Sequence, residues 1–376
     1  MSRPFPRIVQ PRWMLATAAL LLFARAGVAQ DFATQAVATG LEHPWALAFL
    51  PEGRFLVTER PGRMRIVAAD GKIGPALAGV PEVAAAGQGG LLDVVLDSGF
   101  ERNRTLFFCF SEPGLGGNST ALARALLAAD GSRLEQVKVI FSQQPKVASN
   151  LHFGCRIAEA PDGNLFLTLG ERFRRKQDAQ KLDNHLGKVV RLTKDGGPAP
   201  GNPFAGREGA LPEIWSYGHR NPQGAAIAPD GSLWIHEHGP QGGDEINLPQ
   251  AGRNYGWPVI TYGENYGGGP IGEGITRRDG MEQPLHYWVP SIAPSGMAFL
   301  TSDRYGAAMK GSLFVGSLKF AYLDRIELAG GKVLREHKLI DRQGERVRDV
   351  RQGPDGLLYV LTDSNRGKLL RLLPPR

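Results

Sequence analysis

Residues 225–239, AAIAPDGSLWIHEHG, carry the pattern that decides the fold. Two short apolar runs flank the tripeptide Pro229-Asp230-Gly231, in which proline sets φ and glycine supplies a left-handed turn position. Apolar runs on both sides of such a turn predict a β-hairpin. Polar residues and glycines continue outward on either side, over residues 214–221 and 239–245. This stretch therefore predicts a hairpin whose ends carry chemical groups.

The same phrase returns along the chain. Clear copies are FLPEGRFLVTER (49–60), EAPDGNLFLTLGE (159–171), IAPDGSLWIHEHG (227–239) and QGPDGLLYVLTDS (352–364). Two weaker copies are FERNRTLFFCFSE (100–112) and MKGSLFVGSLK (309–319). A small sheet that cannot cover its own faces must stack on its neighbours, and such repeats close into a propeller. We therefore predict an all-β fold, a six-bladed β-propeller of four-stranded antiparallel sheets.

A pair of packed β-sandwiches is the structural alternative. The cysteine and tryptophan pattern of an immunoglobulin sandwich is missing, and no long segment with a 3.6-residue period supports an α/β fold. The 49 glycines and 27 prolines are spread through the 376 residues, as many tight turns require. No linker divides residues 30–376, which we assign to a single propeller domain.

The first 29 residues differ from the rest. A basic region with Arg3, Arg7 and Arg12 precedes an apolar core at residues 14–23, and small residues end at Ala29. This order is typical of a signal peptide, here residues 1–29, and predicts a periplasmic protein. A membrane anchor is the alternative, but the apolar run is shorter than the ~20 residues of a spanning helix. No other stretch is long enough to span a membrane.

Charge and cysteine content limit the partners and the redox chemistry. Four of the 44 lysines and arginines lie in the leader, so 40 basic residues face 37 acidic ones in the remainder. This near balance argues against a nucleic-acid partner. After export, Cys109 and Cys155 are permitted to form a disulfide, but the sequence cannot place their Cα atoms, so their pairing stays open. No cysteine and histidine spacing resembles a zinc site.

Conspicuous polar residues share one phase of the repeat. The distance to the turn aspartate that follows is ten residues for His152 and Arg220, nine for Arg346 and seven for Arg348. In a propeller, one phase means one height and one radius, so these side chains should converge on one mouth of the central channel. One histidine and three arginines there would form a pocket for an anion.

Each of these residues also has an ordinary explanation. An arginine of ERVRDV can be a solvated strand residue paired with Asp349, His152 can be a hydrogen-bonded core histidine, and Asp244 and Glu245 can cap a turn. Agreement in phase among three units favours the pocket over these separate explanations.

Seven motifs, in this order over nearly all of the mature chain, resemble the soluble aldose sugar dehydrogenases. They are GQGGLLDVV (87–95), HFGCRI (152–157), EIWSYGHRNPQG (213–224), EHGPQGGDEIN (237–247), NYGWP (254–258), GSLK (316–319) and RVRDVRQGPDGLLYVLTD (346–363). These relatives of soluble glucose dehydrogenase use pyrroloquinoline quinone (PQQ) and calcium on a six-bladed propeller. The resemblance implies an oxidoreductase that converts aldoses to lactones and passes electrons to a quinone or another acceptor.

The resemblance also implies roles for individual residues. His152 matches the general base that takes the proton of the anomeric hydroxyl while hydride passes to PQQ. PQQ carries three carboxylates, which suit guanidinium groups. The implied cofactor contacts are Gln88, Arg220, Asn221, Lys319, Arg346 and Arg348.

Two calcium sites are implied in the same way. The carbonyls of Gly239 and Pro240 match those that hold the ion to which PQQ binds, where calcium would act as a Lewis acid. Glu245 and the backbone oxygen of Tyr255 match a second, structural site.

Two positions depart from the family pattern. Cys155 stands in place of a glycine, and could crowd the pocket or pair with Cys109. Leu151 replaces an acid found before the histidine in the glucose-specific branch, which would leave the imidazole without an orienting carboxylate and favours a broad aldose preference. Residues 254–279, rich in glycine, are expected to form a loop over the mouth.

Two other functions stay open. A calcium-dependent, lactonase-like hydrolase would need several carboxylates around a central metal, where this sequence has arginines and a lysine. A non-enzymatic binding propeller would meet a protein or glycan at its polar rim and would bind no quinone. The preferred sugar, the electron acceptor and the choice between monomer and dimer do not follow from the sequence.

Overall fold

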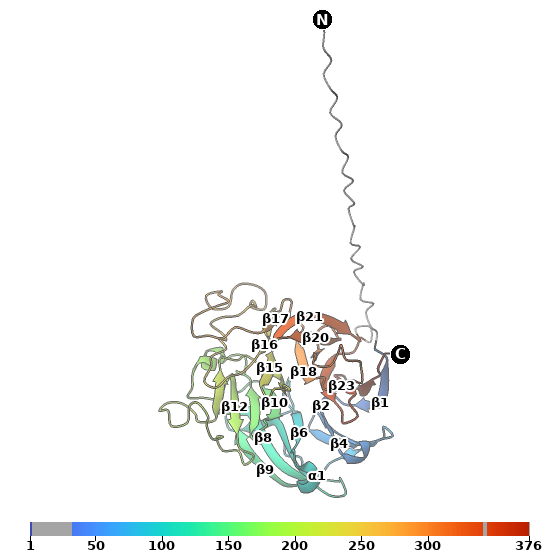
Figure 1. Cartoon of the computed structure of the whole chain (residues 1–376). Helices are drawn as coiled ribbons and strands as arrows, with labels where there is room; N and C mark the ends of the chain where they lie inside the picture. Colours follow the sequence, from blue (N-terminus) through green and yellow to red (C-terminus); the bar gives the residue numbers. More distant parts are fainter. Residues whose placement is uncertain (2–31, 341–343, 376) are drawn as a thin grey trace.

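The computed structural model describes Met1, residues 32–340 and residues 344–375. The predicted signal peptide and its cleavage site at Ala29 lie outside the described residues. Within these residues, 24 strands form six four-stranded antiparallel sheets that are arranged around an axis (Figure 1). The predicted six-bladed β-propeller is therefore confirmed.

Five blades each use four strands that follow one another in the chain. The first blade contains β2 (Pro44–Phe49), β3 (Phe55–Glu59), β4 (Arg63–Val67) and β5 (Ile73–Ala76), and the second contains β6 (Leu91–Leu96), β7 (Thr105–Gly114), β8 (Gly117–Leu127) and β9 (Leu134–Ser142). The third contains β10 (Gly154–Glu159), β11 (Leu165–Leu169), β12 (Lys188–Leu192) and β13 (Ile214–Tyr217), and the fourth contains β14 (Pro222–Ile227), β15 (Leu233–Glu237), β16 (Asp244–Asn247) and β17 (His286–Trp288). The fifth contains β18 (Pro294–Phe299), β19 (Leu313–Ser317), β20 (Leu323–Ala329) and β21 (Lys332–Leu339).

The sixth blade uses both ends of the described chain. Its strands β22 (Val347–Gln352), β23 (Leu358–Thr362) and β24 (Gly367–Leu372) pair in order, and β1 (Thr34–Leu41) adds outside β24. Figure 1 shows β1 in blue beside the red C-terminal strands. Because the first strand completes the last sheet, the ring is closed by backbone hydrogen bonds and not by side chains alone.

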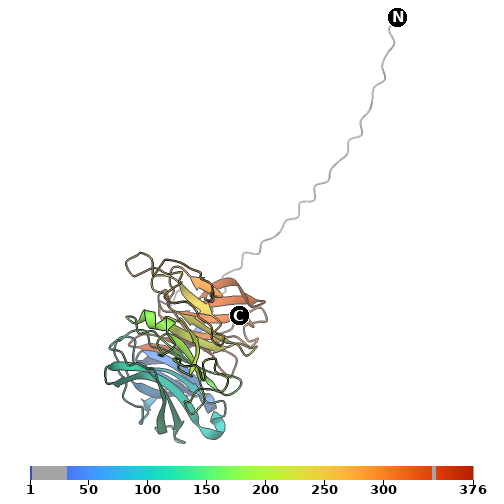
Figure 2. The same cartoon turned by 90° about the vertical axis from the view of Figure 1, so that its left-hand side faces the viewer.

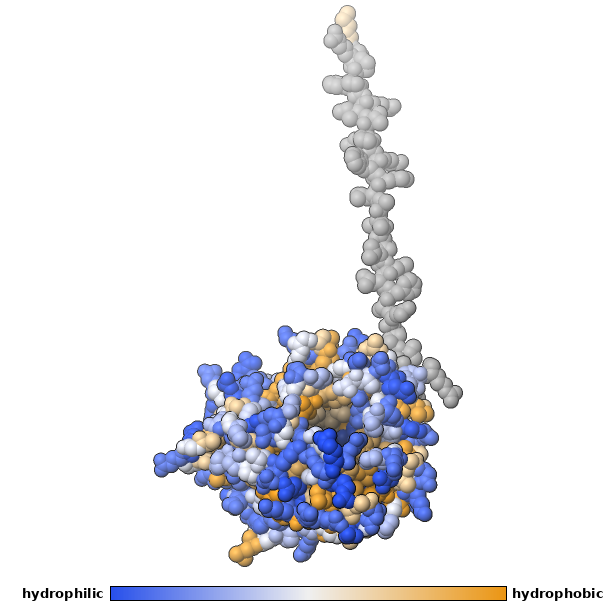
Figure 3. Space-filling view, turned by 60° about the horizontal axis from the view of Figure 1, so that its bottom comes forward, coloured by the Kyte–Doolittle hydropathy of each residue, from blue (hydrophilic) through white to orange (hydrophobic). Residues whose placement is uncertain are grey.

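The apolar runs of the repeat form the second strand of each blade. Every residue of β11 and of β23 is buried, because neighbouring blades cover both faces of a sheet. This explains why the repeated phrase contains continuous apolar residues instead of an alternating pattern. Figure 3 shows a molecular face on which hydrophilic side chains dominate and apolar ones form scattered patches.

The innermost strands converge on the axis, and glycine is required where they meet. A Cβ atom on Gly296 of β18 would lie 2.1 Å from Asp349 Oδ1 of β22, far inside van der Waals contact. Close approach of neighbouring backbones is one of the reasons for glycine within a strand.

A disulfide between Cys109 of β7 and Cys155 of β10 joins the second and third blades, with Cα atoms 5.9 Å apart.

Buried ion pairs fill the axis between the innermost strands. Arg156 Nη1 lies 3.0 Å from Asp349 Oδ1, and Arg351 Nη2 lies 2.7 Å from Asp93 Oδ1. The guanidinium of Arg156 also stacks on the ring of Trp45, 4.0 Å from its centroid. Four blades are thereby linked at the centre, beneath the cavity described below.

The helical segments of the described residues are short. They are α1 (Phe100–Asn103) and the 3₁₀ turns η1 (Pro51–Gly53) and η2 (Lys176–Gln180). None of these helices has the length and apolar character that crossing a bilayer requires. The long connection between β16 and β17 extends beyond the sheets in both views (Figures 1 and 2).

Candidate functional site

A cavity of about 890 Å³ lies where the six blades meet. Each blade contributes a residue at or just before the start of its innermost strand: Trp45, Gln88, Gly154, Asn221, Ala293 and Arg348. A second set follows the second strands of four blades: Arg60, His238, Lys319 and Asp363. Antiparallel neighbours begin and end at the same edge of a sheet, which is why both sets reach one mouth.

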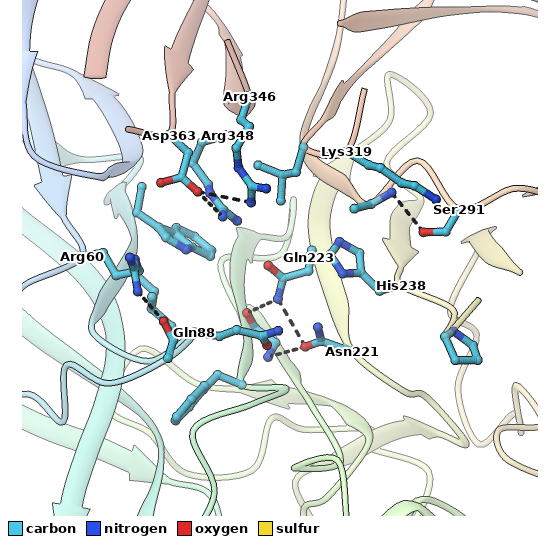
Figure 4. Close-up of a pocket in the computed structure, with 18 of the residues that line it drawn as sticks. Arg60, Gln88, Asn221, Gln223, His238, Ser291, Lys319, Arg346, Arg348 and Asp363 are labelled. Carbon is cyan, nitrogen blue, oxygen red and sulfur yellow. Dashed lines mark hydrogen bonds and ion pairs between the residues drawn. The ribbon is translucent and has the colours of Figure 1, made fainter. Parts of the chain in front are cut away.

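Most of the predicted cofactor residues line this cavity. Figure 4 shows Arg346, Arg348 and Asp363 on one side of the open space, Lys319 and Ser291 on another, and Gln88 and Asn221 on a third. Pro240 also lines it. Arg220 instead lines an adjoining cavity of about 390 Å³, which shares Pro240 and Tyr266 with the first. The predicted loop of residues 254–279 therefore contributes Tyr266 to the walls of both cavities.

Asp363 organises the arginines of the sixth blade. Arg348 Nη2 lies 2.8 Å from Asp363 Oδ2, and Arg346 Nη2 lies 3.6 Å from the same atom. His43 Nδ1 lies 2.8 Å from the other oxygen. Burial opposes ionisation of Asp363, but Arg348 holds the pKa of this carboxyl well below its ordinary value. The expected partner of an arginine in ERVRDV, Asp349, is engaged by Arg156 and Arg351 instead.

Lys319 differs from the arginines. Its side chain is exposed, and its ammonium lies 5.1 Å from the ring centroid of Phe320. Within the described part of the chain, no carboxylate lies within ion-pair distance of it. Lys319 therefore adds an uncompensated positive charge to the wall of the cavity.

His152 is buried beside the cavity and pairs with Glu171. The imidazole Nδ1 lies 3.0 Å from Glu171 Oε1, and the backbone N–H of His152 donates to Gln88 Oε1 at 2.8 Å. Burial, together with the charges of Arg220 and Arg172, lowers the pKa of His152 well below its ordinary value. Burial likewise raises the pKa of Glu171 to about 7, although Arg220 opposes that shift. A neutral imidazole that donates from Nδ1 to Glu171 keeps Nε2 as a proton acceptor.

The expectation that this imidazole lacks an orienting carboxylate is wrong. Leu151 cannot supply one, but Glu171, two residues beyond the end of β11, reaches His152 from the neighbouring strand.

The backbone of His152 has a φ of 53°, and Arg172 and Phe173 have φ values of 65° and 67°. Left-handed conformations in residues other than glycine gather at functional sites, where the surroundings hold them in place.

Asp244 fixes the segment that contains the predicted calcium ligands. One of its oxygens accepts the N–H of Gly239 at 2.8 Å, and the other accepts the N–H groups of Ile292 and Ala293 at 2.7 and 2.9 Å. Arg220 Nη1 donates to the carbonyl of Gly239 at 2.9 Å. Asp244 therefore acts as the turn cap that the sequence allowed, and joins two walls of the cavity.

A cation near Gly239 would depend on backbone oxygens. In the residues that the structure describes, no group of three or more histidine, cysteine, aspartate or glutamate side chains could hold a metal ion. A carbonyl oxygen has two lone pairs, so that of Gly239 can accept from Arg220 and still bind an ion. Calcium takes such carbonyl ligands readily, which makes Gly239 and Pro240 compatible with a site that a bound cofactor completes.

Glu245 belongs to a separate buried network. It faces Glu237 across the β15 and β16 pair, and Asn247 Nδ2 donates to both carboxylates, at 3.1 and 3.2 Å. Burial, followed by the charge of Glu237, raises the pKa of Glu245 to about 8. Tyr255 lies at the other end of the network, because its ring stacks on His219, whose Nδ1 is 2.9 Å from Glu237 Oε1. Two facing carboxylates suit a cation.

Sequence reasoning missed four polar residues that follow the second strands of their blades. Arg60, Glu171, His238 and Asp363 follow the second residue of their turns, Glu52, Asp162, Asp230 and Asp355, by eight, nine, eight and eight residues. The same alignment that grouped His152 with the arginines would have found them. Trp45 carries no such signal, since it is one of many apolar strand residues.

The fold and site define a β-propeller protein with a cationic cavity on its axis and a buried imidazole–carboxylate pair at its edge. A family model described as "Glucose / Sorbosone dehydrogenase" matches residues 41–371. The chain belongs to this family, which confirms the resemblance seen in its motifs.

Individual relatives cover almost the whole chain. The aldose sugar dehydrogenase YliI of Escherichia coli (strain K12) is 46% identical over 341 residues, which are 89% of this chain and 91% of that protein. A crystal structure of a glucose dehydrogenase is 50% identical, with a TM-score of 0.87 over 90% of this chain and 99% of that chain. The PQQ-bound form of an aldose sugar dehydrogenase from Streptomyces coelicolor is 30% identical, with a TM-score of 0.74 over 91% and 99%.

Proposed function

We propose that the protein is a PQQ-dependent aldose sugar dehydrogenase that oxidises aldoses at the anomeric carbon to lactones in the periplasm. The observation that carries this proposal is the composition of the axial cavity. Four cations, Arg60, Lys319, Arg346 and Arg348, line it with one acid, Asp363, which is already paired. A cavity of this kind suits a flat cofactor with several carboxylates. The PQQ-bound relative from Streptomyces coelicolor supports the choice of cofactor.

Buried donors without partners favour the same ligand. Among the described residues, Nε of Arg220 and Nε of Arg348 are buried and make no hydrogen bond. A buried donor that stays unpaired is unfavourable by about 1–3 kcal/mol, so both groups suit an acceptor supplied by a ligand. The residues that would hold PQQ are Gln88, Arg220, Asn221, Lys319, Arg346 and Arg348. When bound, PQQ supplies the two-electron acceptor for the hydride that leaves C1 of the sugar.

His152 is the proposed general base. Its Nε2 takes the proton of the anomeric hydroxyl as C1 gives up its hydride, so that a C1=O bond forms and a lactone results. Glu171 holds the ring through Nδ1, and burial keeps the imidazole neutral and able to accept a proton. Arg220 lines the same cavity as Glu171, and its backbone oxygen accepts the N–H of Glu171 at 2.9 Å, so its positive charge lies near the proposed catalytic pair.

Calcium has two proposed places. Gly239 and Pro240 would bind an ion through their carbonyls, together with the cofactor, and Glu245 with the carbonyl of Tyr255 would bind a structural ion.

A calcium-dependent hydrolase is the weaker candidate function, because the axial cavity offers four cations where that chemistry needs carboxylates. Electrons would pass from the reduced cofactor to a quinone or another acceptor.

Reconstitution tests the proposal. Purified protein is titrated with PQQ and calcium, and cofactor absorption and dye reduction are followed with a panel of aldoses. We expect His152→Ala to lose turnover by at least about a hundredfold while it keeps cofactor absorption, because a general base contributes about 10²–10⁴ to rate.

Arg348→Gln should weaken PQQ uptake, and Arg335→Gln on the exposed face of β21 serves as the matched control. Failure of the wild-type protein to bind PQQ at micromolar concentration would refute the proposal.

A further inference from the structure

The adjoining cavity of about 390 Å³ lies directly beside the proposed catalytic pair. Glu171, the partner of His152, lines it, as does Arg220. It adjoins the axial cavity at Pro240 and Tyr266, which line both. A sugar whose anomeric carbon lies near His152 would extend the rest of its ring into this space.

The charged side chains of this cavity are mostly cations. Arg174, Lys176 and Arg220 line it with a single acid, Glu171, which is engaged by His152. Arg174 and Lys176 have no ion-pair partner within the described ranges, whereas the intervening Arg175 pairs with Asp178. The cavity therefore has positive charge that the surrounding protein does not neutralise.

The segment that carries these cations is anchored on both sides. Arg172 donates to the carbonyls of Leu151 and Asn118, both at 3.0 Å, and its guanidinium stacks on Phe153, 3.8 Å from the ring centroid. On the other side, buried Lys188 donates to the carbonyls of Asp178 and Ala179 at 3.0 and 3.2 Å. Anchors before and after the segment keep Arg174 and Lys176 at the cavity wall.

Another part of the wall offers an aromatic side chain, over which the Arg220 guanidinium lies 5.2 Å from the ring centroid, and a free donor. Trp257 is 8% exposed and lines the cavity, and its indole Nε1 has no hydrogen-bond partner among the described residues. Asn265, Tyr266 and Ile271, from the loop of residues 254–279, complete this wall. An aromatic ring beside polar donors is a suitable surface for a pyranose.

We propose that this cavity binds the end of the substrate remote from the anomeric carbon and selects aldoses that carry an anionic group there. The carboxylate of a hexuronic acid and the phosphate of an aldose phosphate share the required chemistry. Arg174 and Lys176 bind the anion, and Trp257 contacts the ring. The inference rests on the proposed dehydrogenase function and specifies its substrate class.

Steady-state kinetics with PQQ-loaded protein tests the inference with glucose, glucuronate and glucose 6-phosphate at low ionic strength. We expect kcat/KM for at least one anionic sugar to exceed that for glucose, and added salt to reduce this preference. In the double variant R174Q/K176Q, the preference should fall about tenfold, mainly through KM, because charge-assisted hydrogen bonds are lost. Arg175→Gln, in the same segment but paired with Asp178, is the matched control and should keep the preference.

Binding gives a second readout that does not need turnover. Calorimetric titration with glucuronate and with glucose 6-phosphate should show weaker binding to R174Q/K176Q than to wild type or R175Q, and comparison of the two ligands distinguishes a carboxylate site from a phosphate site. Oxidation of glucose with no preference for either anionic sugar would overturn this inference and leave the proposed function intact. Absence of turnover with every aldose, together with absence of PQQ uptake, would overturn the proposed function itself.

Discussion

His152 and Glu171 illustrate how burial sets the chemistry of single residues. Each side chain is almost inaccessible to water, so burial penalises the charged form of both. The pKa of His152 falls and that of Glu171 rises to about 7, which leaves a hydrogen-bonded pair with little net charge near neutral pH. Such an imidazole accepts a proton at neutral pH without first having to lose one.

Replacement of Glu171 by glutamine should change the pH dependence of turnover. As pH rises through about 7, Glu171 ionises and becomes a stronger acceptor for the hydrogen bond that Nδ1 of His152 donates, so kcat/KM of the wild type should rise over this range. Glutamine cannot ionise, so this rise should disappear, and kcat should fall about 10- to 100-fold because the ring is less well oriented. The measurement is dye reduction with glucose from about pH 5 to about pH 9. A variant with the wild-type midpoint would show that another group titrates.

Glu245 allows a test of calcium that is independent of activity. Its folded-state pKa of about 8 lies above the ordinary value of 4.5. The protonated carboxyl therefore stabilises the fold fully below about pH 4.5, and this contribution is lost as pH rises to about 8. A bound cation would remove the penalty of ionisation.

We therefore expect Glu245→Gln to raise the melting temperature of the calcium-free protein at about pH 8. The same variant should lose the rise in melting temperature that millimolar calcium gives the wild type. Thermal unfolding in EDTA and in calcium measures both effects, and Glu208→Gln at an exposed position is the control. An unchanged response to calcium in the Glu245 variant would place the structural ion elsewhere.

At the scale of elements, the ends of strands carry the chemistry and their cores carry the fold. The first and second strands of a blade start and end at the same edge, so residues that follow β11, β15 and β23 meet residues that precede β10, β14 and β22. Cross-links between neighbouring blades then determine how firmly these ends are held. The disulfide of Cys109 and Cys155 is one such link, three residues from His152.

Loss of this disulfide should destabilise the protein more than it changes the site. The cross-link closes a loop with a sequence separation of 46, for which chain entropy predicts about 4 kcal/mol of stabilisation. The double variant C109S/C155S should therefore have a lower urea midpoint, and reduced wild type should match it. Equal midpoints for oxidised wild type, reduced wild type and variant would show that the link does not contribute to stability.

The whole molecule depends on closure between its two ends. β1 pairs with β24 from Thr34, opposite Leu372, to Leu41, opposite Gly367. Without β1 the sixth sheet has three strands and exposes the edge of β24, and edges of this kind promote association between chains.

Removal of residues 32–41 should therefore abolish a cooperative thermal transition and produce aggregates in size-exclusion chromatography. A chain that begins at Phe32 keeps β1 and is the control, for which we expect a single sharp transition. If the shortened chain melted like the control and remained monodisperse, side-chain packing between the first and sixth blades would be sufficient for closure.

The sequence by itself determined the number of blades, the position of the turns and the height of the first ring of site residues. These features are local, because a proline-aspartate-glycine turn and the apolar run after it identify a hairpin wherever they occur. The motifs then identified the family, and with it the residues that we assign to PQQ, to calcium and to proton transfer.

Only the tertiary structure decided which side chains meet. Asp363 and His43 are 320 residues apart in the chain, and no periodicity predicts their contact. Glu171 reaches the imidazole of His152 through the pairing of β10 with β11, and Cys109 reaches Cys155 between neighbouring blades; the repeat spacing predicts the heights of these side chains, but not that they are in contact. The spacing of the repeat predicts the height of a side chain along the propeller axis and its distance from that axis. Its contacts with residues of neighbouring blades depend on how the sheets twist and pack.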